Sequence, residues 1–219
     1  EEGESRLRAI VAGIANELRW DLTVSENKVV AVVTSFDSLT PPWARSEYVQ
    51  GERQLSEELE WYQARLGLGL AAHGRIGPGA IDNALDVALT LETGNLWFDE
   101  GDRTDPTFVL PTKTFEYRGH LRVRADALVR NTLELPHRGW SAGADGVWGR
   151  RVDWEPWGLP TNGLETGGDA WLAASAFAYV ATGIPGLSER HTLVGSAHAG
   201  TGSDLDRFSA FRLGSGSTW

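Results

Sequence analysis

The sequence predicts an α+β fold, with helices mainly in the N-terminal ~90 residues and an antiparallel, β-rich C-terminal part that contains one late helix. Apolar residues recur at helical spacing before residue 92, and the period changes to two from Phe115. A helical apolar run then returns at Ala170–Ala181. We expect a single domain over residues 1–219, with a soft boundary near residues 92–106.

The first predicted helix begins behind a candidate N-cap at Ser5. Trp20, Leu22 and Val24 then alternate, and Val29–Val33 is expected to form a partner strand. The helix itself is predicted because apolar residues recur three or four positions apart, at Leu7, Ile10, Val11, Ile14 and Leu18.

Three further helices are predicted. The second spans Ser56–Leu66 and ends at Gly67, because glycine favours helix termination. The third spans about Ala80 to Leu91, and the fourth covers Ala170–Ala181, capped by Asp169.

The cleanest strand signal starts at Phe115, where apolar and polar residues alternate. Phe115 and Tyr117 share one face of this strand with Leu121 and Val123, while Arg118, His120, Arg122 and Arg124 share the other with Glu116 and Asp126. Residues 139–168 are expected to form short strands and loops, and short strands near Leu193 and Phe208–Leu213 close the chain.

Composition excludes several classes of protein. The chain of 219 residues carries 20 basic and 30 acidic residues, and a net charge of −10 makes nucleic-acid binding unexpected. With no cysteine there is neither a disulfide framework nor a thiolate metal site, and we expect no metal and no cofactor.

No apolar run reaches the ~20 residues that a spanning helix needs, so we expect a soluble protein without membrane insertion, at an undetermined location such as a virion or the extracellular space. Position 1 is Glu rather than Met, which suggests processing, trimming or a partial sequence.

Ten tryptophans are several times ordinary usage, and four of them fall within a glycine-rich stretch: Trp140, Trp148, Trp154 and Trp157. Aromatic faces with neighbouring carboxylates are typical of sugar binding. Asp153 and Glu155 are the weak catalytic candidates, because glycoside hydrolysis uses paired carboxylates. A core or interface role is the competing interpretation of the same rings.

The arginine face of the Phe115 strand offers three interpretations. Arg118, Arg122 and Arg124 could pair with an acidic partner protein, with nucleic-acid phosphates, or with carboxylates on an ordinary solvated sheet face. A Ser196–His198–Asp204 nucleophilic set lacks the expected local motif, so a glycine-rich surface loop is favoured there.

We therefore predict a non-catalytic structural subunit of a large homo-oligomeric assembly, of virion or shell type, whose partners are copies of itself. The same tryptophans and arginines would form its interfaces, together with Trp219 in the Gly/Ser tail. The alternative is a secreted glycan-active enzyme or glycan-binding module that uses residues 139–169.

Overall fold

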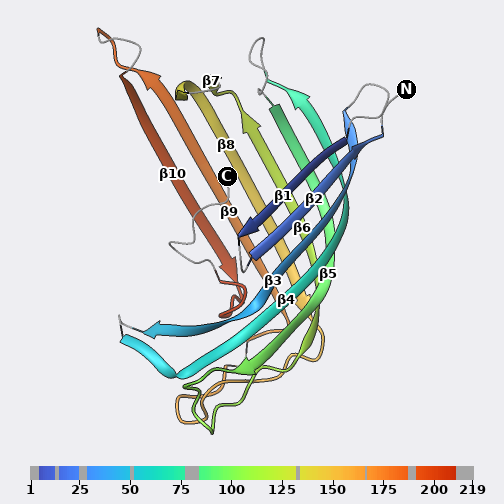
Figure 1. The fold of residues 1–219 in the computed structure, drawn as a ribbon, viewed down its shortest axis with the longest axis vertical. Helices are drawn as coiled ribbons and strands as arrows, with labels where there is room; N and C mark the ends of the chain where they lie inside the picture. The colour runs from blue at the N-terminus through green and yellow to red at the C-terminus, as the bar shows by residue number, and fades with distance from the viewer. Residues whose placement is uncertain are drawn as a thin grey trace.

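The computed structural model describes residues 5–12, 15–24, 29–49, 52–76, 84–131, 134–165, 167–186 and 191–210. Ten antiparallel strands form a sheet that curls along its width, and neighbours in the sheet follow the order of the chain (Figure 1). Only the short β7 leaves this order, because it pairs with β8 alone. The strands are β1 (Ser5–Ala12), β2 (Ala15–Thr23), β3 (Val30–Val49), β4 (Glu52–Arg75), β5 (Ala84–Glu100), β6 (Thr114–Asp126), β7 (Val129–Asn131), β8 (Glu134–Arg151), β9 (Ala170–Gly183) and β10 (Thr192–Ser203).

The predicted α+β fold is wrong, because the described part of the chain contains strands and no helix. The first predicted helix is the β1–β2 hairpin, and the second lies within β4. The third corresponds to β5, apart from residues 80–83 outside the described ranges, and the fourth is β9. Among the described residues, none forms a helix long and apolar enough to cross a membrane.

The helical patterns arose because both faces of the sheet carry apolar residues. In the second predicted helix, Leu59 is 0% exposed and Leu66 is 63% exposed, on opposite faces of β4. In the fourth, Trp171 is buried while the adjacent Leu172 is exposed. When residues of both faces are apolar, alternation is hidden and helical spacing is matched by coincidence.

The strand predicted from Phe115 is confirmed as β6, with the predicted division of residues between its two faces. Two expectations nearby are wrong. Residues up to Arg151 belong to the long β8 rather than to short strands, and the expected glycine-rich loop around Ser196 is strand β10. Glycine is tolerated there because β10 is exposed along its length.

The sheet has two chemically distinct faces. We call the face that carries Asp37, Arg65 and Glu92 the inner face, and the opposite one the outer face. Register partners lie on the same face, so one outer row can be followed across five strands. It runs through Leu22, Val32, Leu70, Leu89 and Leu121.

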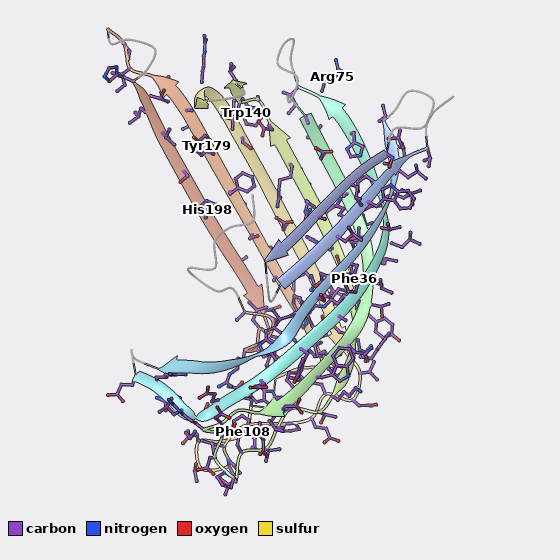
Figure 2. The ribbon with its side chains drawn as sticks, in the orientation of Figure 1. Phe36, Arg75, Phe108, Trp140, Tyr179 and His198 are labelled. Atoms are coloured by element: carbon purple, nitrogen blue, oxygen red, sulfur yellow. The ribbon has the colours of Figure 1, made fainter. Side chains whose placement is uncertain are left out.

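A hydrophobic core closes one end of the inner face, where loops fold beneath the sheet. Figure 2 places Phe108 at this end and Trp140 near the other. Phe208, from the segment after β10, packs against Trp61 and Trp157 with ring centroids 5.3 and 5.2 Å apart. The buried members of this core are Leu39, Leu59, Trp61, Leu96, Phe108, Trp157 and Leu159.

Candidate functional site

A chain of buried charges crosses the inner face near the core. Glu116 on β6 accepts hydrogen bonds from Arg65 Nε and Arg151 Nε, both at 3.1 Å. Arg65 also donates to Asp37 at 3.2 Å, and Arg151 pairs with Asp206. The side chains of Glu116 and Arg151 are each 1% exposed, so these two charges depend on their neighbours for solvation.

The Arg151 guanidinium joins the charge chain to the aromatic core. Its central carbon lies 4.5 Å from the ring centroid of Trp154. Asp206, its carboxylate partner, also accepts hydrogen bonds from the backbone N–H groups of Phe208 and Ser209. The charge chain therefore holds the segment after β10 against the end of the sheet.

A second charged cluster lies along the inner face of β5, β6 and β8. His120 has ring nitrogens 3.0 Å from Asp145 Oδ1 and 3.4 Å from Glu92 Oε1. Arg118 Nε lies 3.3 Å from Glu92 Oε2, although without hydrogen-bond geometry, and Arg122 and Arg124 both reach Asp145. Each cation thus lies beside a carboxylate of a neighbouring strand.

A hollow of about 180 Å³ opens on the inner face between these two clusters. Its lining includes Arg19 from β2 and Arg122 from β6, so the inner face is concave over several strands. Gly67 leaves room for this arrangement, because a Cβ there would lie 2.2 Å from Ser35 Oγ and 3.0 Å from Glu92 Cγ. The hollow presents both signs of charge, and in its lining the Thr90 hydroxyl donates a hydrogen bond to Glu92 Oε1 at 3.3 Å.

The outer face is uncharged over long stretches. On β4 its residues are uncharged from Tyr62 to Gly74, on β5 from Leu85 to Trp97, and on β6 from Phe115 to Ala125. Large apolar side chains project from it with more than a third of their surface exposed. They include Trp20, Leu22, Leu68, Leu70, Leu85, Val87, Leu89, Leu91, Leu121, Trp140, Trp148, Leu172 and Val180.

On β8 the uncharged stretch has defined limits. Trp140 and Trp148 are 44% and 51% exposed on the outer face, and Arg138 and Arg150 follow on the same face beyond them. Strands rise about 3.4 Å per residue, so the two tryptophans are about 27 Å apart along β8. At each end of the uncharged stretch of β8, a tryptophan is therefore followed by an arginine.

The structure separates the four tryptophans of the glycine-rich stretch. Trp140 and Trp148 lie on the outer face, whereas Trp157 is 2% exposed in the core and Trp154 packs against Phe98. The core interpretation therefore holds for the last two only. Trp219 lies outside the described residues.

The two weak catalytic candidates lie in the loop after β8. Asp153 and Glu155 are both exposed, and Asp153 has a positive φ of 54°. The loop is not a strand, so strand geometry does not place the two carboxylates on one side. Trp154 between them points into the core, which leaves no exposed indole between the two carboxylates.

The three arginines predicted as contacts lie on the inner face, as the alternation of β6 indicated. Arg118, Arg122 and Arg124 lie close to carboxylates of β5 and β8. Of the three interpretations of these arginines, the structure therefore agrees with a sheet face on which they pair with carboxylates of neighbouring strands. Ser196 and His198 share one face of β10, while Asp204 follows the end of the strand.

Sequence reasoning missed the outer face. The signal was present, because Leu66, Leu68 and Leu70 alternate with glycines, and apolar residues occupy every second position of Leu85–Leu91. Leu66 and the apolar residues of Leu85–Leu91 also fit the spacing of the second and third predicted helices, which conceals their place on a strand face. The partners of Glu116 had no local signal, because they lie 51 and 35 positions away in the chain.

Comparisons with known proteins add no assignment. No family model matches the chain, and neither a curated protein nor a solved structure matches it. Among the described residues, no group of three or more His, Asp or Glu side chains is placed to hold a metal ion.

Proposed function

We propose that this sheet is embedded in a membrane, with its outer face against lipid hydrocarbon and its charged inner face turned away from lipid. The observation that carries the proposal is the separation of charge between the faces. Across the central rows of β4, β5 and β6, the described charged side chains belong to the inner face. A water-exposed sheet gains nothing from an uncharged face of leucines, whereas lipid excludes charge strongly.

The dimensions of the outer face support this proposal. A strand that crosses a bilayer needs about 9–11 residues when tilted, and the uncharged stretches of β4, β5, β6 and β8 reach that length. The stretch from Trp140 to Trp148, about 27 Å along β8, has the length that a tilted strand needs to cross the apolar band of a bilayer. Tryptophan prefers the membrane–water interface, and arginine next to it can extend its guanidinium into water.

The expectation of no membrane insertion was argued from spanning helices alone. A strand alternates lipid-facing and polar residues, so it produces no long apolar run. Many charged side chains of the inner face form ion pairs within the sheet, between neighbouring strands or across β5. The proposed role is thus a membrane-embedded scaffold that holds a concave, charge-lined surface.

The predicted homo-oligomeric subunit is a second candidate, favoured by the edges of the sheet. Among the described residues, β1 and β10 each pair along one edge only. Unpaired backbone groups at a sheet edge readily accept another strand, and a second copy could supply one. The glycan alternative keeps the exposed carboxylates of Asp153 and Glu155 and the exposed rings of Trp140 and Trp148, but no exposed indole lies between the two carboxylates.

Flotation of the protein with vesicles tests the proposal. The protein is refolded from denaturant in the presence of phosphatidylcholine vesicles, which are washed with alkaline carbonate and floated on a density gradient. We expect the protein to float after the wash, because an embedded sheet is not removed by carbonate. A protein that stays in the aqueous fraction as a stable oligomer would contradict the membrane proposal and support the assembly subunit.

A further inference from the structure

A second hollow lies on the outer side of the sheet, where the uncharged surface ends. It encloses about 420 Å³ and is lined by Tyr62, Trp97, Phe98, Asp99 and Lys113. Tyr62 and Trp97 are register partners on β4 and β5, and the next outer row pairs Glu60 with Asp99. The hollow thus lies at the transition from apolar to charged residues.

The chemistry of this hollow is that of a zwitterion-binding site. The ammonium nitrogen of Lys113 lies 5.3 Å from the centroid of the Trp97 ring. Among the described residues, no carboxylate lies within salt-bridge distance of Lys113. Desolvation and the nearby Asp99 carboxylate raise the pKa of the Tyr62 hydroxyl. The hollow therefore offers one cation without a counter-ion, one carboxylate, and aromatic surface between them.

We propose that this hollow binds the headgroup of a zwitterionic phospholipid, a phosphate joined to a primary or quaternary ammonium. Lys113 contacts the phosphate, and Asp99 contacts the ammonium beside the ring of Tyr62. Tyr62 and Trp97 also offer apolar surface to the first carbons of the lipid chains. This inference rests on the proposed membrane function, because a lipid headgroup reaches the hollow only when the adjacent outer face is in a bilayer.

The arrangement selects against other headgroups. A purely anionic headgroup would bring a phosphate to Lys113 but leave Asp99 and Glu60 without a cation, and both would repel it. A purely cationic ligand would be repelled by the ammonium group of Lys113, which lies against the Trp97 ring. Only a ligand with both charges complements the hollow.

Spin-labelled lipids test this preference in vesicles that contain the folded protein. The motionally restricted fraction of labelled phosphatidylcholine is compared with that of labelled phosphatidylglycerol by electron paramagnetic resonance. We expect the unaltered protein to retain phosphatidylcholine several-fold more strongly. Lys113→Gln should weaken retention of both lipids, and Asp99→Asn should remove the preference for phosphatidylcholine. Asp102→Asn, an exposed acidic residue of the following turn, is the matched control and should leave both values unchanged.

The outcomes separate the headgroup site from the membrane proposal. If no restricted lipid component forms at all, the membrane proposal fails. If one forms with equal retention of both lipids and the two variants behave as the unaltered protein, the headgroup site alone is overturned.

A second arm identifies the source of the headgroup. The chain has only two lysines, so Lys28→Arg leaves Lys113 as its single ε-amine. Acetylation of Lys113 is followed by mass spectrometry with phosphatidylcholine vesicles, with dissolved phosphocholine, and with inorganic phosphate. We expect protection by the vesicles only. Equal protection by dissolved phosphocholine would overturn the lipid source.

Discussion

The Glu116 carboxylate accepts a hydrogen bond from Arg151 Nε at 3.1 Å, and each side chain is 1% exposed. Arg65 completes the solvation of the same carboxylate from β4. A buried ion chain of this kind forces specific strands and the segment after β10 into one arrangement. Removing Glu116 costs more than the pair contributes, because Arg65 and Arg151 stay buried with one carboxylate partner fewer each.

Glu116→Ala should therefore lower the free energy of unfolding by about 3–5 kcal/mol, since Arg65 and Arg151 lose their shared carboxylate. Denaturant unfolding in detergent micelles measures the change. Glu155→Ala, in the exposed loop, is the control and should stay within about 0.5 kcal/mol of the unaltered protein. A Glu116→Ala change as small as that of the control would show that the ion chain does not determine stability.

A charge on the outer face should oppose membrane insertion. Leu89 is 55% exposed at the centre of the uncharged surface, and Leu89→Arg should reduce the free energy of insertion by about 2–4 kcal/mol. The floated fraction in the vesicle assay, measured against urea concentration, reports this loss. Leu164→Arg places the same charge in a loop on a leucine that is 40% exposed and should change little. Equal behaviour of the two variants argues for a water-exposed outer face.

Gly67 should be intolerant of a side chain. Gly67→Ala places a Cβ against Ser35 Oγ and Glu92 Cγ, and crowding of this kind typically costs about 1–3 kcal/mol. Adding Ser35→Ala removes the closest atom and should recover part of the loss. The midpoint of denaturant unfolding compares the two variants. If the double variant recovers none of the lost stability, contact with Ser35 is not the cause of the crowding.

The turn after β5 should contribute a pH-dependent stability. Hydrogen bonds from the Thr107 hydroxyl and the Thr107 backbone N–H lower the pKa of Asp105. Because the folded pKa lies below the unfolded one, this contribution is present above the unfolded pKa of about 4 and is lost as the pH falls through the folded value. Asp105→Asn should remove this part of the acid sensitivity. Unfolding midpoints between about pH 6 and pH 2.5 measure it, and an unchanged slope in the variant would contradict this assignment.

The sequence could predict part of this fold. The strand from Phe115 and its charged face are read from strict alternation, which helical spacing does not imitate. Leu59 and Leu66 match helical spacing by coincidence, because one lies in the core and the other on the outer face of β4. The spacing of apolar residues shows which positions avoid charge. It does not show whether those positions lie in the core or on the outer face of the sheet.

The candidate sites could be predicted from the sequence less well than the strands. The hollow at Trp97 depends on the register that places Tyr62 opposite it and on the loop that brings Lys113 to its ring. Such contacts are set by strand pairing over long separations. The tryptophan surplus is plain in the sequence, but its division between the core and the outer face depends on the positions of Trp157 and Trp148 in the fold.

A spin-label scan along β5 tests the central claim most directly. The chain has no cysteine, so single cysteines from Leu85 to Glu92 can be labelled one at a time in vesicle-bound protein. Accessibility to oxygen, which concentrates in lipid, is compared with accessibility to a water-soluble nickel complex. We expect oxygen accessibility to peak at every second position, at Leu85, Val87, Leu89 and Leu91, with low nickel accessibility at those sites. High nickel accessibility at the same four positions would contradict a lipid-facing sheet.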